Sequence, residues 1–252
     1  MKNKILILYK FLVVFLIASN LHAEELKIIS SEVKLDKKSS NIIFQGNIKA
    51  SDENQNVLEA EKAIYKKNKD ILNSIGPTKI ITGKNYIFES KDVIFDNKNK
   101  FIKSNYPTKI TDPEGNTIFV NMFNYNSIKN ILFSRGNIEF KDKNKNIYKF
   151  SEIYIDEKKK KIVGSDAKLF LNDESLKTDE RNNPRLFANS ITINDEITSV
   201  QKGTFTYCAF REGQKCPPWE IRAKKIKYNT SKKTIYYDNA FLKIYDFPIF
   251  YF

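Results

Sequence analysis

Histidine is almost absent from this sequence: its 252 residues contain one, His22, and that residue lies in an N-terminal segment with the features of a secretory signal peptide. Residues 1–23 carry three lysines and no acidic residue, an apolar stretch at 11–18, and a small residue, Ala23, at the expected cleavage point. We therefore expect export across an inner membrane, with an uncleaved N-terminal anchor as the alternative. The mature chain would then lack histidine, which excludes histidine-dependent nucleophiles, general bases and metal sites.

Cysteine and glycine are also scarce. Cys208 and Cys216 are too few for a four-ligand zinc site, and eight glycines leave little room for a glycine-rich phosphate loop. Catalysis would have to use carboxylates, and no paired carboxylate motif stands out. We expect a protein that is not an enzyme and that uses no metal or cofactor. In an oxidising compartment the two cysteines are candidates for disulfide bonding.

Apolar residues are plentiful enough for a folded core. Hydrophobic residues make up 41% of the sequence and aromatic residues 13%, which is not the composition of a disordered chain. The net charge is +13, and the lysine runs at 66–69 and 158–161 fall between apolar segments, at positions typical of turn tips. Because solvated charge is ordinary there and export removes most nucleic-acid partners, we expect no nucleic-acid binding.

An internal repeat with a period of 30 residues organises the chain. The sequence at 77–80 recurs at 107–110, and the sequence at 46–48 recurs 90 positions later, at 136–138. Triplets with an apolar or aromatic residue at the first and third positions follow the same period. They begin at Ala63, Val93, Phe123 and Ile153, and two further copies follow at wider spacings of 38 and 35 residues, at Ile191 and Ile226. Each unit therefore predicts strand, short polar turn, strand, and a corner marked by glycine or proline.

The repeat predicts an all-β fold of stacked antiparallel strands, with helix confined to the signal peptide. Such strands bury their apolar faces by stacking as a sandwich, a jelly roll or a solenoid. The residues expected to line the interior are Ile48, Ala63, Tyr65, Val93, Phe95, Phe123, Tyr125, Ile138, Ile153 and Ile155. This interior is either a sealed core or a binding path, and the pattern alone does not decide between them.

The repeat resembles the OstA-like periplasmic domain of the lipopolysaccharide (LPS) transport proteins. Its pattern is a small or polar residue, an apolar residue, any residue, an aromatic residue, Asp or Asn, and a turn. The C-terminal part resembles the segment that leads into the outer-membrane barrel in the LPS-assembly (LptD-type, organic-solvent-tolerance) family. The motifs that carry this second likeness are Tyr207-Cys208, Cys216-Pro-Pro-Trp-Glu-Ile-Arg-Ala223, Asn239-Ala-Phe-Leu-Lys-Ile244 and Phe247-Pro-Ile-Phe-Tyr251.

The resemblance implies an open β-jelly roll at 24–200, followed at 201–252 by a cysteine-containing β segment that leads toward a barrel. Family members continue into that barrel, whereas this sequence stops at Phe252. The implied activity is non-catalytic transfer of LPS acyl chains through the interior, in the periplasm and at the outer membrane. The implied partners are LPS, an LptA-like periplasmic bridge protein that pairs by edge strands, and an LptE-like outer-membrane lipoprotein if a barrel is present.

Three further expectations accompany this resemblance. Cysteines of this region bridge to the barrel in the family, and without a barrel Cys208 and Cys216 are expected to pair with each other. A free LptA-like bridge is an alternative role, although the C-terminal motifs argue against it. A secreted carboxylate-dependent hydrolase on a β scaffold is the alternative from another class, and it would need two carboxylates in a polar cleft.

Overall fold

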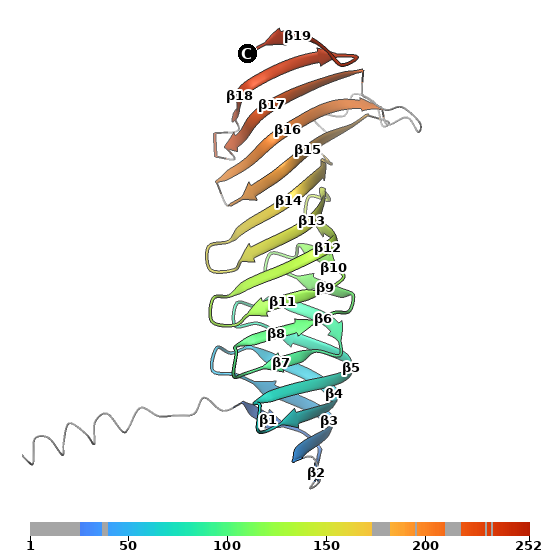
Figure 1. The fold of residues 1–252 in the computed structure, drawn as a ribbon, viewed down its shortest axis with the longest axis vertical. Helices are drawn as coiled ribbons and strands as arrows, with labels where there is room; N and C mark the ends of the chain where they lie inside the picture. The colour runs from blue at the N-terminus through green and yellow to red at the C-terminus, as the bar shows by residue number, and fades with distance from the viewer. Residues whose placement is uncertain are drawn as a thin grey trace, which may run out of the picture.

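Alternating apolar and polar residues form strands along almost all of the chain that the computed structural model describes. The described residues are 26–36, 40–172, 182–194, 196–209, 218–229, 231–232 and 234–252. Within them the fold is all-β, with 19 antiparallel strands hydrogen-bonded into one continuous sheet. The strands stack along the long axis, with β1 and β2 at one end and β19 at the other (Figure 1). No helix in the described part is long and apolar enough to cross a membrane.

The strands fall into long ones of 10 to 13 residues and short ones of 3 to 5. Their bounds are β1 Lys27–Ile29, β2 Glu32–Asp36, β3 Asn41–Ser51, β4 Val57–Lys66, β5 Ile71–Ile81, β6 Ile87–Lys91, β7 Ile94–Asp96, β8 Phe101–Ser104, β9 Thr108–Thr111, β10 Thr117–Val120, β11 Phe123–Asn126, β12 Ile131–Lys141, β13 Ile147–Asp156, β14 Lys161–Phe170, β15 Asn182–Ile193, β16 Ile197–Ala209, β17 Trp219–Asn229, β18 Thr234–Ile244 and β19 Phe247–Tyr251.

Each long strand contributes to two walls of the jelly roll. The first half of β5 pairs with β7 and its second half with β6, and β12 likewise pairs with both β11 and β10. We call wall A the part that contains β2, β7, β8, β11 and the adjoining halves of the long strands. Wall B contains β1, β6, β9, β10 and the other halves. The two walls therefore meet at a bend in the middle of every long strand.

Glycine in the left-handed backbone region forms this bend at three repeat-related positions. Gly46 has φ 76°, Gly76 has φ 83° and Gly136 has φ 109°. These values cost glycine little and strain other residues. The register of β12 against β13 shifts between Arg135 and Ile138, which is a β-bulge of the kind that turns a strand. The glycine-marked corners predicted from the sequence are these bends.

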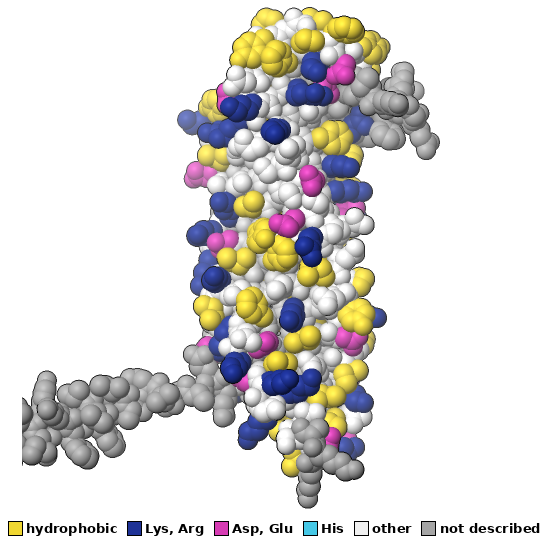
Figure 2. Space-filling view, in the orientation of Figure 1, with side chains coloured by type: hydrophobic (Ala, Val, Ile, Leu, Met, Phe, Trp, Pro, Cys, Tyr) yellow, Lys and Arg dark blue, Asp and Glu magenta, His cyan; other side chains and the backbone are white. Residues whose placement is uncertain are grey.

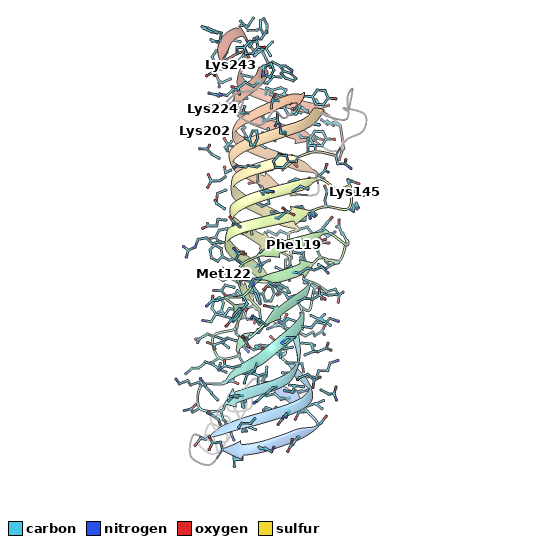
Figure 3. All side chains as sticks on the ribbon, turned by 90° about the vertical axis from the view of Figure 1, so that its right-hand side faces the viewer. Phe119, Met122, Lys145, Lys202, Lys224 and Lys243 are labelled. Atoms are coloured by element: carbon cyan, nitrogen blue, oxygen red, sulfur yellow. The ribbon has the colours of Figure 1, made fainter. Side chains whose placement is uncertain are left out.

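Two rows of turns lie along the mouth of the jelly roll, on the side opposite the bend. We define turn row A as residues 66–71, 96–101, 126–131 and 156–161, and turn row B as residues 51–57, 81–87, 111–117 and 141–147. Figure 3 shows Met122 and Lys202 on the side of the bend and Lys145, in turn row B, on the other side.

Backbone hydrogen bonds stack the turns of row A on one another. The amide of Ser127 donates to the carbonyl of Lys100 over 3.0 Å, and the amide of Glu157 donates to the carbonyl of Asn130 over 3.0 Å. In row B, asparagine side chains form the hydrogen bonds that join successive turns. The Oδ1 atoms of Asn56, Asn116 and Asn146 accept from the amides of Gly83, Lys143 and Asn172 at 3.2, 3.0 and 2.7 Å. These contacts hold successive repeats in register.

The strand content agrees with the all-β prediction throughout the described residues. The signal peptide predicted at 1–23 lies outside the described residues. The expected division at 200/201 falls inside β16, which pairs with β15 and β17 along both edges. The different roles assigned to the two sides of that division stay predictions.

Candidate functional site

The structure places the residues predicted for the interior on the inner faces of the two walls. Nine of the ten are buried, and Tyr65 is partly buried against them. The neighbours expected to point the other way, Ile94 and Asn124, are less buried than the residues flanking them. The strand phase deduced from the 30-residue period is therefore correct, whereas contact with lipid stays a prediction.

An unbroken row of cross-strand neighbours lines wall B. Each member faces the next across a hydrogen-bonded pair of strands, and every member is apolar or aromatic. The row consists of Ile28, Ala50, Leu58, Ile80, Phe88, Ile110, Ile118, Phe140, Tyr148, Leu169, Leu186, Phe205, Ile221, Leu242 and Phe250. With strands about 4.8 Å apart, the row extends over roughly 65 Å.

A second apolar row runs along wall A. Its members are Leu35, Ile42, Tyr65, Leu72, Phe95, Ile102, Tyr125, Leu132, Ile155, Ile162 and Ile193. Beyond Ile193 the next partner is Thr198, so this row is less uniform in the C-terminal strands. Together the two rows make an apolar interior that continues from one repeat to the next.

The sequence prediction missed every member of the wall B row. It took the apolar triplets, which lie in wall A, and added only Ile48 and Ile138 from the other wall. The same period would have found the rest, because Leu58, Phe88 and Ile118 are 30 residues apart.

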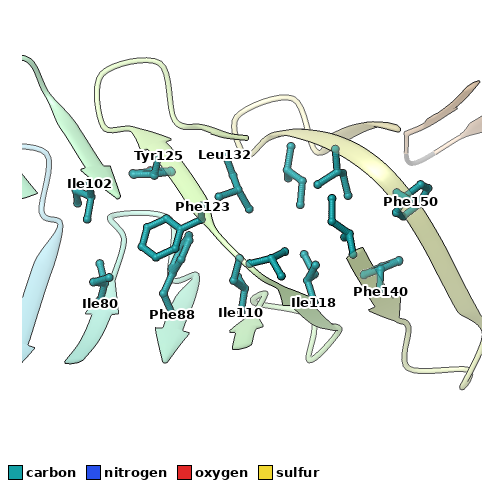
Figure 4. Packing of buried hydrophobic residues seen from close by; sticks show 14 of the residues in the cluster. Ile80, Phe88, Ile102, Ile110, Ile118, Phe123, Tyr125, Leu132, Phe140 and Phe150 are labelled. Carbon is teal, nitrogen blue, oxygen red and sulfur yellow. The ribbon is translucent and has the colours of Figure 1, made fainter. Parts of the chain in front are cut away.

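Aromatic rings from the two walls pack against each other in the middle of the interior. The ring centroids of Phe88 and Phe123 are 5.0 Å apart, and those of Phe88 and Tyr125 are 5.9 Å apart. Ile102 and Leu132, beside them, are fully buried (Figure 4). In this structure the chain's own side chains fill the interior in the central repeats.

Toward the C-terminal strands, the side chains beside the bend are smaller and the interior residues are less buried. Small residues succeed one another beside the bend of wall B: Ala167, Ala188, Gly203, Ala223 and Ala240. In the same strands, three members of the apolar rows are only partly buried: Leu186, Ile193 and Ile221. Access to the interior is therefore greater at this end of the molecule.

Contacts across the mouth join the two turn rows. Lys100 of row A pairs with Glu53 of row B over 3.1 Å, and Lys160 of row A pairs with Glu114 of row B over 3.5 Å. We call the line formed by these two ion pairs and the buried residues beside them the seam: Glu53, Thr82, Glu114, Lys100, Tyr125, Glu157 and Lys160. It closes the mouth over the central repeats, opposite the bend.

Glu157 is the buried acidic group of the seam. The hydroxyl of Tyr125 donates to its Oε2 over 2.8 Å, and the Nδ2 of Asn130 donates to the Tyr125 oxygen over 3.2 Å. Burial raises the pKa of the Glu157 carboxyl to about 7, and the nearby Thr82 hydroxyl opposes that shift. Burial and the Glu157 charge raise the pKa of Tyr125 as well, so its phenol keeps its proton.

The other buried carboxylates have structural partners. Asp52 accepts from the backbone amide and the side-chain Nδ2 of Asn56, both at 2.8 Å, and Glu220 pairs with Arg222 over 2.8 Å. Within the described residues no group of three or more His, Cys, Asp or Glu side chains is placed to hold a metal ion. These carboxylates stabilise turns and strands.

A shallow groove of about 1000 Å³ lies on the outer face of wall B, lined by Phe119 and by charged side chains. Those charges neutralise one another, since Lys109 pairs with Glu89 over 3.0 Å and Lys149 with Glu139 over 3.6 Å. The groove thus presents no excess of either sign.

Both ends of the sheet expose apolar side chains. Among the described residues, β1 and β2 each pair with β3 alone, and Ile29, Val33 and Leu35 on them are exposed. At the other end, hydrophobic side chains gather over β18 and β19 (Figure 2). They include Phe241, Phe247, Ile249, Phe250 and Phe252. The side chains of Cys208 and Cys216 lie outside the described residues, so their pairing stays a prediction.

Comparison with known proteins gives little beyond the fold. No protein-family model matches the sequence, and no curated protein matches it. Among solved structures, this chain is similar to LptH, described as the LptA homologous periplasmic component of the conserved lipopolysaccharide transport device from Pseudomonas aeruginosa. The similarity covers 44% of this chain and 82% of that chain, with 14% sequence identity and a TM-score of 0.39. It does not assign this chain to a family.

Proposed function

We propose that this chain is a non-catalytic, exported carrier of LPS, whose acyl chains travel along the apolar interior while the sugars stay in water. One observation carries the proposal: the wall B row keeps an apolar or aromatic residue on every strand of that wall, from Ile28 to Phe250. A sealed core needs a buried centre, but it does not need the same face to continue to both ends of the sheet.

The energetics suit a carrier. Burying an acyl methylene contributes about 0.8 kcal/mol, so an apolar trough can hold several chains without covalent chemistry. Because successive repeats offer the same kind of surface, movement from one repeat to the next changes the free energy little. Among the described residues, the walls are joined covalently at the bend and by side-chain contacts at the seam, so separation at the mouth would make room for the chains.

The ends of the sheet support a place in a chain of carriers. Edge strands offer unpaired backbone groups to a neighbouring sheet, and both ends of this sheet are apolar as well. We propose that the β1 and β2 end receives an LptA-like bridge protein. The opposite end, with β18 and β19, would face the outer membrane in an LptD-type assembly protein, together with an LptE-like lipoprotein. The C-terminal sequence motifs and the exposed aromatic residues there support this orientation over a free bridge.

The arrangement of carboxylates disfavours a hydrolase. A glycosidase-type site needs two carboxylates in a polar cleft, about 5 to 9.5 Å apart. The inner rows of this chain are apolar, and Asp52, Glu157 and Glu220 each bond to a nearby structural partner.

Photo-crosslinking in cells tests the proposal. Benzoylphenylalanine at Phe95 or Phe123, which face the interior, is expected to capture LPS. The same group at Ile94 or Asn124, on the outer side of the same strands, is the matched control and is expected to capture much less. Equal capture at both positions, or capture at neither, would show that the interior is packing alone.

A further inference from the structure

The seam contacts differ sharply in burial. In the Lys160–Glu114 pair, both side chains are more than half exposed to solvent, and such a pair contributes at most about 1 kcal/mol. Between the two ion pairs, Thr82 and Tyr125 are 1% exposed and Glu157 is 5% exposed. The Lys100 side chain is only 12% exposed, so its pair with Glu53 and this buried middle section are the best protected parts of the closed mouth.

The repeat pattern is broken on both sides of the mouth at this section. In turn row A, the positions equivalent to Glu157 hold Lys67, Asn97 and Ser127, none of which is acidic. In turn row B, the positions equivalent to Thr82 hold Asp52, Asp112 and Asp142.

The departures from the repeat pattern at Thr82 and Glu157 together have an electrostatic effect. Each of those aspartates accepts from an asparagine four residues later, whereas Thr82 is followed by Tyr86. An aspartate at 82 would place a second carboxylate beside Glu157. With threonine there, the section keeps a single buried acid.

The ionised form of Glu157 is poorly supported where it lies. Oε2 accepts one hydrogen bond from Tyr125, and Oε1 has no well-aligned hydrogen-bond partner among the described residues, although the nearby Thr82 hydroxyl favours the charge. Lys84, across the mouth, favours the charged form of Glu157, whereas the neighbouring Asp156 opposes it. Tyr86 of row B is a second phenol near this group, and burial and the Glu157 charge both raise its pKa. A buried carboxylate with an unpaired oxygen is costly, and separation of the turn rows would hydrate it.

We propose that Glu157 is the latch of the seam: its neutral carboxyl keeps the turn rows together, and its charged form lets them part and uncover the apolar rows beneath. This inference rests on the proposed function, because the opening that the latch controls would admit lipid. Tyr125, which donates to Glu157, belongs to the wall A row and faces Leu132 in that row. The latch itself is a property of the lipid-free chain.

The sign of the pH dependence follows from linkage. The pKa of Glu157 is about 7 in the closed form, against 4.5 for an ordinary glutamate. The closed form therefore binds the proton more tightly than the open form, and it loses stability as pH rises from about 4.5 through 7. Between pH 6 and pH 8.5 these values predict an increase of about tenfold in the open population.

Amide hydrogen exchange of the lipid-free chain tests this, read on peptides that cover 123–132 and 153–158 and corrected for intrinsic exchange. The wild type is expected to open about tenfold more at pH 8.5 than at pH 6. Glu157→Gln, which stays neutral, is expected to lose this dependence. Glu139→Gln, on the outer face of wall B, is the matched control and is expected to keep it. Equal pH dependence in wild type and Glu157→Gln would overturn the latch.

A titration of the wild-type side chain by carboxyl NMR adds a test that needs no variant. A midpoint near 7 for Glu157 supports the latch, and one near 4.5 overturns it. Neither experiment contains lipid. Failure of the latch with LPS capture intact would leave the carrier function standing, and an intact latch without LPS capture would refute the carrier function alone.

Discussion

Gly164 shows how closely the interior side chains approach the backbone. A Cβ atom at this position would lie 2.5 Å from Cδ1 of Phe150, which occupies the space that the glycine leaves. Both residues are buried, and Phe150 belongs to the adjoining strand β13. This position therefore requires glycine because the Phe150 ring leaves no space for a larger side chain, and not because of its backbone conformation.

Gly164→Val is expected to destabilise the chain by about 1 to 3 kcal/mol, because the new side chain overlaps the Phe150 ring. Urea denaturation of the purified chain measures this loss. Lys161→Val, at the exposed start of the same strand, introduces the same residue and should change stability by less than about 0.5 kcal/mol.

A second variant separates overlap from other effects of the valine. If overlap is the cause, Phe150→Ala should cost less in the Gly164→Val background than in the wild type. Strictly additive losses in the double variant would show that Phe150 is not the group responsible.

Turns of row B owe their shape to an aspartate–asparagine bracket that recurs with the repeat. In the turn at 112–116, Asp112 Oδ1 accepts from the amides of Glu114 and Asn116, both at 2.9 Å. Its Oδ2 accepts from the Nδ2 of Asn116 over 2.6 Å. This leaves the Oδ1 of Asn116 facing the next turn, where it accepts from the amide of Lys143.

Asp112→Ala is expected to cost about 1 to 3 kcal/mol, because it removes three acceptor contacts of a charged group. Hydrogen exchange should rise at 112–116 and also at Lys143, one turn away, since the stacking bond depends on the bracket. Pro113 and Gly115 would remain to favour the turn. Lys143→Ala is the control, because it keeps both the amide and the bracket. Unchanged protection at Lys143 in Asp112→Ala would show that the stack is held by other contacts.

At the level of elements, the sequence predicted the strands, the bends and the phase of wall A, because all three follow from local residue patterns with a fixed period. Tyr125 and Ile155 were placed inward by alternation alone. The seam was not predictable in this way. Lys100 meets Glu53 and Lys160 meets Glu114 only because the bend brings the two turn rows together, and no local pattern encodes that pairing.

The two ends of the molecule should differ in what they bind. β2 carries Val33 and Leu35 as exposed apolar residues on an edge strand. A double substitution, Val33→Asp with Leu35→Asp, adds two negative charges to that edge. It should reduce crosslinking to an LptA-like bridge protein by at least about tenfold, since charge on an edge strand and lost apolar contact both oppose strand addition. Ile128→Asp, on an exposed turn, is the control and should leave crosslinking unchanged. Equal loss in both variants would place the bridge contact elsewhere.

The central claim for the whole molecule is that acyl chains occupy the space between the two walls. Intermolecular nuclear Overhauser contacts between lipid A acyl methylenes and the methyl groups of the chain measure this occupancy directly. The account predicts contacts to Leu72, Ile102 and Leu132, which are fully buried in the lipid-free structure, and none of comparable strength to the exposed Ile128 or Ile197. Contacts confined to the exposed isoleucines, or none at lipid concentrations that saturate binding, would contradict it.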